Sequence, residues 1–273
     1  MVDIKEQELY PTQEVTEQLT PRKDEYVHIK FQEEGNEVLV DEALKIHAEG
    51  YRALGFINED AIDKNGHVVS AIDHARGPSV DYYLAIKSEN EPDNSLTVRM
   101  INIPNGEDFT ILPAYKLCGE NLNPDGLGLL LNIPANKLKE LAALSRTSEA
   151  TEAGLLELLR DVYQDSYGKN EYWFFSVVDR TLRWLEIQFG STNFMKIGSE
   201  TTIEDPRVKK KVILIPALFK IDDLFKNMMK NIAVSKNGQE RDKLVTTFLY
   251  FLEGIPEANL SEEVVDFKIG LKA

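Results

Sequence analysis

The strongest constraint on the fold comes from the segment Tyr172 to Val178. It reads Tyr-Trp-Phe-Phe-Ser-Val-Val, an almost unbroken apolar run. A strand with apolar side chains on both faces has to be covered on both faces, so it belongs inside a sheet that carries helices on either side. We therefore expect a protein that mixes helices and strands, with this strand at the centre of its sheet.

The segments around this strand alternate between strand and helix patterns. Val80 to Lys87 and Leu96 to Ile103 are apolar and are joined by the turn Asn90 to Asn94, which predicts an antiparallel hairpin. Residues 104 to 138 are rich in Pro, Gly and Asn, and we expect a long loop with one short helix there. The remaining expected elements are strands at 26–31, 139–146 and 212–218, and helices at 41–54, 155–168, 179–189, 222–233 and 240–253. Pro216 predicts that the last strand lies at an edge or contains a bulge.

These elements suggest three parts. Residues 1–25 are polar and interrupted by prolines, so they are expected to form a leader segment. Residues 26–220 contain the strands and form the main domain, and residues 221–273 form a helical extension that packs on the same domain.

Composition excludes several classes of function. The net charge of -15 would repel nucleic acid and anionic lipid, so we expect neither as a partner. The single cysteine, Cys118, cannot form an internal disulfide, and four scattered histidines show no zinc-ligand spacing. We expect no metal, no transmembrane segment and no tightly bound cofactor, and a cytoplasmic location. The oligomeric state stays open.

The order of several short motifs indicates a family. A helix ends in Leu54-Gly55-Phe56, Asp73 precedes Gly77-Pro78 and an apolar strand, Arg99 lies on the next strand, and Ser145-Arg146 ends a third. This order resembles the acyl-homoserine-lactone synthases and the long-chain N-acyl amino acid synthases of the GNAT superfamily. The resemblance implies a GNAT-like fold, in which a mixed, largely antiparallel central sheet is flanked by helices. Here extra C-terminal helices would be added.

The resemblance also implies roles for individual residues. Asp73 and Arg99 would shape the pocket for an amine, with Asp73 within salt-bridge reach of Arg99, and Phe56 would be a further substrate-binding residue. The other readings are a turn cap for Asp73 and a solvated strand position for Arg99. Because an unpaired buried charge costs several kcal/mol, Arg99 should reach a carboxylate or a cavity.

The thioester side of the site would be formed by Ser145 and Arg146. They lie where a strand opens onto a helix N-terminus, whose free N–H groups can hold a phosphate or a carbonyl oxygen. The family's Glu-x-Ser-Arg signature has Ala143 in place of Glu, so Glu140 is the substitute candidate for the base. Trp173 and Phe175 would line the acyl tunnel, although aromatic residues on strands are more often core.

These residues together predict an N-acyltransferase. It would move a fatty acyl group from a thioester carrier, acyl carrier protein or CoA, to the amine of a small amino-acid-like acceptor. The alternative is a catalytically silent GNAT-like binding or regulatory protein, because Ala143 and Arg76 replace acidic residues of the family. A splayed strand pair with a tunnel beside Phe175 would favour acyl transfer, whereas a filled cleft would favour the silent scaffold.

A basic cluster is the last candidate site. Arg207, Lys209, Lys210 and Lys211 stand together in an acidic chain, just before the final strand. Acyl carrier proteins are strongly acidic, so this cluster is a candidate docking surface for the carrier. An ordinary solvated charge run that protects a sheet edge is the other interpretation.

Overall fold

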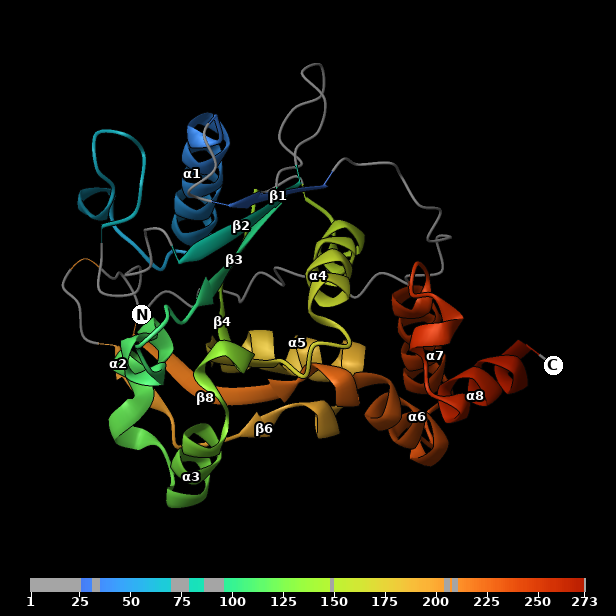
Figure 1. Cartoon of the computed structure of the whole chain (residues 1–273). Coiled ribbons are helices and arrows are strands. Elements are labelled where there is room, and N and C mark those ends of the chain that lie inside the picture. The colour runs from blue at the N-terminus through green and yellow to red at the C-terminus, as the bar shows by residue number, and fades with distance from the viewer. Residues whose placement is uncertain are drawn as a thin grey trace, which may run out of the picture.

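The computed structural model describes residues 26–30, 35–69, 79–85, 96–147, 150–203, 207 and 211–272. They contain one eight-stranded sheet in the order β1-β2-β3-β4-β5-β8-β6, with β7 also paired to β8 (Figure 1). The strands are β1 (Tyr26–Lys30), β2 (Val80–Ala85), β3 (Leu96–Asn102), β4 (Leu138–Arg146), β5 (Tyr172–Val178), β6 (Met195–Lys196), β7 (Thr201–Ile203) and β8 (Val212–Lys220). All neighbouring strands are antiparallel except β4 and β5, which are parallel. The predicted mixed, largely antiparallel sheet is confirmed, and β5 lies in its interior.

Helices cover both faces of the sheet, as the apolar character of β5 requires. One face carries α1 (Glu37–Ala53), α2 (Pro113–Cys118) and α3 (Pro124–Asn132). The other carries α4 (Glu152–Ser166), α5 (Asp179–Phe189), α6 (Leu224–Val234) and α7 (Gly238–Leu252), with α8 (Glu262–Lys272) against α6 (Figure 1). Alternation along β5 sends Phe174 into the first core and Trp173 and Phe175 into the second. A largely antiparallel sheet flanked by helices, with additional C-terminal helices, is the arrangement that the sequence predicted. No helix in the described ranges is long and apolar enough to cross a bilayer.

Three helical segments differ from the sequence prediction. α1 begins at Glu37, earlier than the predicted Asp41. The segment 104–138 holds two short helices, α2 and α3, where one was expected. The Asn123 side chain explains the start of α3, because its oxygen accepts the Gly126 N–H at 2.6 Å and so caps a helix that begins with a proline. The helix α8 had not been predicted.

The prediction that Pro216 marks an edge or a bulge was wrong. β8 lies between β5 on one side and β6 and β7 on the other. The Pro216 carbonyl accepts from Ile197 N at 3.0 Å, so the backbone of Pro216 faces the interval between the end of β6 and the start of β7. In the described chain, no residue of β6 or β7 pairs with β8 at this position. The missing N–H of Pro216 therefore interrupts no hydrogen bond between strands.

The sheet separates into two halves between β4 and β5. These strands pair only from Leu138 to Glu140, opposite Tyr172 to Phe174. Beyond Glu140, β4 follows β3 while β5 follows β8. A bulge on β4 lies at this point: two residues, Ala143 and Leu144, stand opposite Val98 alone, and Ala143 has a φ of 52°. Because a bulge bends and twists its strand, it turns β4 away from β5.

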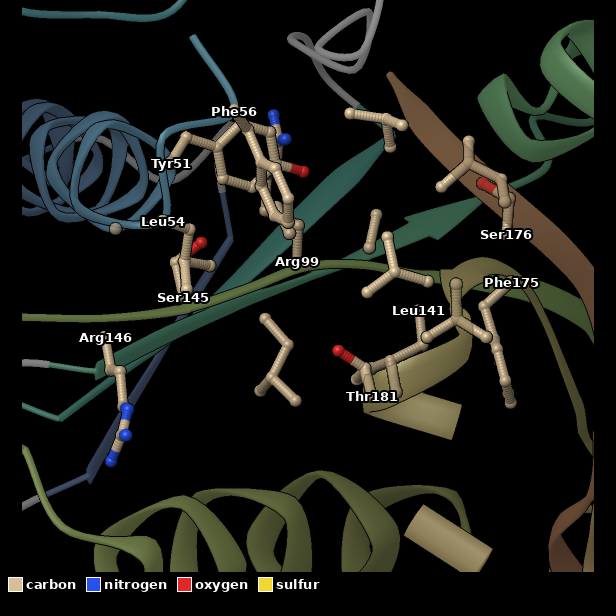
Figure 2. A pocket seen from close by; sticks show the side chains of 18 of the residues that line it. Tyr51, Leu54, Phe56, Arg99, Leu141, Ser145, Arg146, Phe175, Ser176 and Thr181 are labelled. Carbon is tan, nitrogen blue, oxygen red and sulfur yellow. The ribbon is translucent and has the colours of Figure 1, made fainter. Parts of the chain in front are cut away.

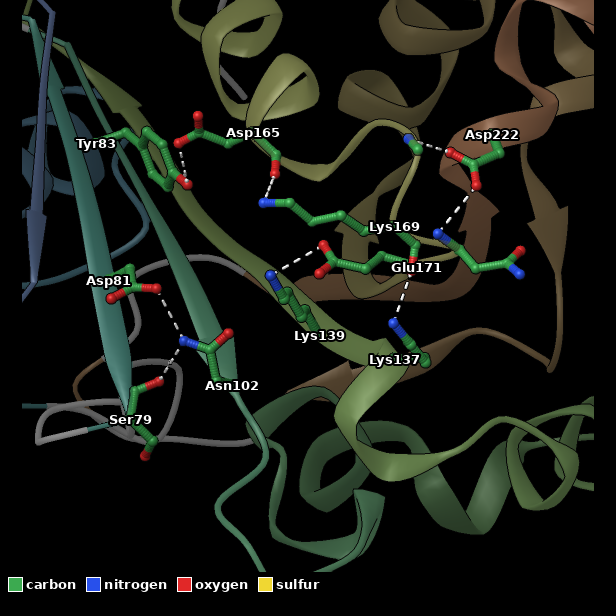
Figure 3. Close-up of polar contacts among 12 residues, drawn as sticks. Ser79, Asp81, Tyr83, Asn102, Lys137, Lys139, Asp165, Lys169, Glu171 and Asp222 are labelled. Atoms are coloured by element: carbon green, nitrogen blue, oxygen red, sulfur yellow. Dashed lines mark hydrogen bonds and ion pairs between the residues drawn. The ribbon is translucent and has the colours of Figure 1, made fainter. Parts of the chain in front are cut away.

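Polar contacts hold the paired end of these two strands together (Figure 3). Lys139 on β4 forms an ion pair with Glu171, the residue before β5, with 2.9 Å between Nζ and Oε2. The turn that leads into β5 is fixed by Asp222, whose two oxygens accept the backbone N–H groups of Gly168 and Asn170 at 2.8 and 3.0 Å. One end of the β4–β5 pair is therefore fastened, while the other end is open.

Candidate functional site

A cavity of about 330 Å³ occupies the opening between β4 and β5 (Figure 2). Its walls come from both faces of the sheet, so the cavity passes from the α1 side to the α4 and α5 side. Most of the wall is apolar; Arg99 and Ser145 line it on the α1 side, and Arg146 and Thr181 line it on the α4 and α5 side. The residues that carry the argument below are Tyr51, Phe56, Arg99, Glu140, Ser145, Arg146, Phe175 and Trp184.

A chain of three buried polar side chains forms the α1 side of the cavity. Arg99 on β3 is 3% exposed, and its Nη2 lies 3.3 Å from Nε2 of His47 on α1. Nδ1 of His47 lies 2.9 Å from Oγ of Ser145 on β4. The hydrogen bonds to buried neighbours offset the cost of placing these polar groups in the interior.

The close approach of α1 to β4 makes this chain possible, and it depends on Gly50. A methyl group at Gly50 would lie 3.1 Å from Ser145 Cβ and 3.2 Å from the Arg146 carbonyl oxygen. Both distances are tighter than an ordinary van der Waals contact. Glycine at this position therefore lets the helix come near enough for His47 to reach Ser145.

Glu140 is a buried carboxyl group at the point where β4 and β5 separate. Its Oε2 accepts the Ala114 N–H at 2.8 Å, at the N-terminus of α2. Burial raises the pKa of Glu140 to about 8, against a smaller opposite effect of the Ala114 hydrogen bond and of the positive charges of Arg99 and Lys116. A carboxyl group in this state can take up or release a proton near neutral pH.

The opposite side of the cavity is apolar and ends at aromatic side chains. Phe175 on β5 and Trp184 on α5 contribute to this wall, together with Leu155 on α4. Trp184 is held in place by Glu152, whose Oε1 accepts the indole N–H at 2.9 Å. The same carboxylate meets Lys243 on α7 at 3.3 Å, so its charge is balanced. This wall can bury an unbranched hydrocarbon chain.

Arg146 lies at the end of β4, and its side chain points away from Ser145 (Figure 2). Its Nη1 donates to the Ala150 carbonyl at 2.7 Å. This bond ties the arginine to the connection between β4 and α4. The position of Arg146 suits a phosphate-bearing ligand at the start of α4. The negative charge of Glu152 nearby is already engaged by the Trp184 indole N–H and the Lys243 ammonium group.

Most of the predicted catalytic and substrate-binding residues meet at the cavity. Phe56, Arg99, Glu140, Ser145, Arg146 and Phe175 all line it. Trp173 does not: alternation along β5 places it on the same face as Phe175 but deeper in the core, where it packs on Phe219 with 5.6 Å between ring centroids. Asp73 and Arg76 lie outside the described residues, so the predicted pair of Asp73 with Arg99 stays a prediction.

The sequence did not reveal the parts played by His47 and Trp184. His47 lies on the apolar face of α1, where its position alone is typical of a core residue, and it is buried with its hydrogen-bond partners on β3 and β4. No local spacing could have indicated a contact with Ser145, since the two residues are 98 positions apart. Trp184 belongs to the apolar face of α5, where a cavity wall and a core have the same pattern.

Two members of the basic cluster can be placed. The Arg207 side chain donates to the Val69 carbonyl, and its own carbonyl accepts the Asn58 N–H at 2.9 Å. Lys211 is exposed, and it directly precedes Val212, which lines the cavity. Lys209 and Lys210 lie outside the described residues. The two placed members thus lie close to the Phe56 side of the cavity.

Comparison with known proteins gives one similar structure. No protein-family model matches the chain, and no curated protein matches it. The solved structure of FeeM, an N-acyl amino acid synthase from uncultured soil microbes, is similar with a TM-score of 0.47 and 16% sequence identity. The similarity covers 74% of this chain and 96% of that one.

Proposed function

We propose that this chain is an N-acyltransferase that moves a fatty acyl group from a thioester to the amine of a small amino-acid-like acceptor. One observation carries the proposal: a largely apolar cavity crosses the sheet where β4 and β5 separate, with buried Arg99 and Ser145 on its α1 side. An open cleft at this place favours acyl transfer, whereas a filled cleft was expected for a silent scaffold.

The apolar side suits the acyl chain. Phe175, Trp184 and Leu155 would surround it, and each buried methylene would contribute about 0.8 kcal/mol to binding. The thioester carbonyl would then lie at the opening in the sheet, beside Glu140 and Ser145. The amine would approach from the α1 side, where Arg99 provides a positive charge for the carboxylate of an amino-acid-like acceptor.

In the reaction, the amine nitrogen attacks the thioester carbonyl carbon, and a tetrahedral intermediate forms. Glu140, in its ionised form, accepts a proton from the attacking amine. The Ser145 hydroxyl donates a hydrogen bond to the developing oxyanion. The carbon–sulfur bond then breaks, and the thiolate leaving group takes up the proton that Glu140 had accepted, so the products are an amide and a free thiol and Glu140 is again ionised. This route requires no covalent enzyme intermediate.

The donor would be a thioester of acyl carrier protein or of CoA, and the basic cluster supports the carrier protein. Arg207 and Lys211 border the Phe56 side of the cavity, and a basic surface there would attract an acidic carrier despite the net charge of -15. Arg146 would face the phosphate of the carrier's prosthetic arm. We expect Arg146→Ala to lower thioester turnover while its far-UV circular dichroism spectrum stays the same as that of the parent. Equal turnover by variant and parent would remove Arg146 from the mechanism.

The experiment that tests the proposal uses purified protein with acyl carrier protein thioesters or CoA thioesters of several chain lengths, and a mixture of amino acids. Mass spectrometry should detect N-acyl amino acids with the parent, and a much smaller amount with Glu140→Gln. Binding of a thioester without any amide product would refute the proposal and favour the silent binding protein suggested by Ala143. Lipid extracts of expressing cells provide an independent search for the product.

A further inference from the structure

We propose that His47 is a positioning residue: Arg99 fixes its tautomer, and His47 in turn directs the Ser145 hydroxyl into the cavity, toward the acyl carbonyl. The inference rests on the proposed function. It assigns a role to a side chain on α1 that does not itself line the cavity.

The tautomer follows from the chemistry of arginine. A guanidinium group has only N–H donors, so Nε2 of His47, 3.3 Å from Arg99 Nη2, has to accept. An imidazole that accepts at Nε2 carries its proton on Nδ1. A doubly protonated ring would place two donors against each other and add a second positive charge beside Arg99. The geometry therefore assigns the neutral ring with the proton on Nδ1.

This tautomer decides what Ser145 can do. Nδ1–H donates to Ser145 Oγ over 2.9 Å, so the serine oxygen is the acceptor in that bond. The hydroxyl proton of Ser145 is then available for a different acceptor, and the side chain lines the cavity. This polarity is the reverse of a serine nucleophile, whose hydroxyl must give its proton to histidine. Ser145 is thereby equipped to donate to a carbonyl oxygen and not to attack it.

The surroundings hold the imidazole in one orientation. Tyr51 packs edge-on against the His47 ring, with 4.0 Å between the centroids and 61° between the planes. Gly50, on the same helix, permits the close contact of α1 with β4. His47 is 1% exposed, so water does not compete for its two nitrogens. A donor held in this way needs little reorganisation when negative charge develops on the substrate oxygen.

The tautomer can be measured without any substrate. A long-range ¹H–¹⁵N correlation spectrum of protein labelled with ¹⁵N-histidine distinguishes the two neutral tautomers from the charged ring. The chain has four histidines, and His47→Asn identifies the signals of His47 by their loss. We expect the Nδ1–H form at pH 7. An Nε2–H form, or a charged ring, would overturn the proposal.

Two substitutions separate positioning from packing in the acyl-transfer assay. Asn places an amide donor near the position of Nδ1, whereas Gln reaches the position of Nε2 and loses the bond to Ser145. His47→Gln should lower kcat about 100-fold, as Ser145→Ala should, with little change in KM for the thioester. His47→Asn should recover most of that loss. His67→Gln, at a histidine bonded to Asp41 by 2.7 Å and outside the cavity wall, is the control.

The outcomes separate the two proposals. Equal losses for His47→Asn and His47→Gln, or additive losses for His47→Gln and Ser145→Ala, would refute the positioning role. A chain with the Nδ1–H tautomer but no turnover of any thioester would refute the proposed function and leave the hydrogen-bond assignment intact.

Discussion

Replacing Glu140 with glutamine should make the protein more stable, and increasingly so as pH rises. Burial raises the pKa of Glu140 to about 8, whereas the ordinary value of 4.5 applies in the unfolded chain. Between these values only the folded state keeps the proton. The stability that this protonated carboxyl contributes is complete below pH 4.5 and is lost as pH rises toward 8. Glutamine has the same shape, still offers an oxygen to the Ala114 N–H, and cannot ionise.

The size of the effect follows from that pKa difference. Each pH unit is equivalent to about 1.4 kcal/mol, so the loss in the parent reaches about 3 kcal/mol at pH 7 and about 4 kcal/mol at pH 8, where half of the folded chains have also lost the proton. The free energy of unfolding of Glu140→Gln minus that of the parent should therefore grow by about 3–4 kcal/mol between pH 5 and pH 8.

Urea unfolding at pH 5, 6, 7 and 8 measures this difference directly. Glu120→Gln, at an exposed position before α3, is the control and should follow the parent within about 0.5 kcal/mol. A constant offset between Glu140→Gln and the parent would mean a packing change, and would refute the reasoning. The same variant should lose acyl transfer, whose rate in the parent should rise as pH increases through about 8.

Three further predictions concern the helix contact, the apolar wall and the basic cluster. Gly50→Ala should destabilise the protein by about 1–3 kcal/mol in urea unfolding, because the new methyl group would clash with β4. This clash exceeds the gain in helix propensity, which is at most about 1 kcal/mol. Gly270→Ala is the control: Gly270 has open space around it, so this change should be neutral or stabilising. Trp184→Ala should shift the products seen by mass spectrometry toward longer acyl chains, and an unchanged distribution would remove Trp184 from the chain-length limit. Charge reversal at Lys209 and Lys211 should weaken binding of acyl carrier protein at low salt and matter little at high salt. Surface plasmon resonance without a salt-dependent loss would favour CoA as the donor.

The strands could be predicted because their patterns are local. The apolar run of β5 and the hairpin of β2 and β3 both depend on side chains within a few residues of each other. α3 was missed because Pro124, Gly126 and Gly128 are typical of a loop. Gly126 is there for a tertiary reason, since the Ile197 backbone leaves no room for a side chain. Such a contact is formed by residues far apart in the sequence.

The candidate site was predictable only in part for the same reason. The family motifs pointed to Arg99 and Ser145, but the histidine that joins them comes from a third element. The positive φ of Ala143 gave no signal, because alanine is a poor residue for that conformation and costs about 1–2 kcal/mol there. Strain of this kind is found where tertiary structure determines the backbone.

The separation of β4 from β5 also bears on aggregation. A sheet that divides creates two new edges, and from Leu141 to Ser145 the edge of β4 that faces β5 pairs with no strand in the described chain. Exposed edges of this kind recruit strands from other molecules. Here they face each other inside the sheet, with α1 over one face and α4 and α5 over the other, so helices cover them on both faces. The protein thus keeps unpaired main chain at its centre, accessible to a slender ligand but protected from intermolecular strand pairing.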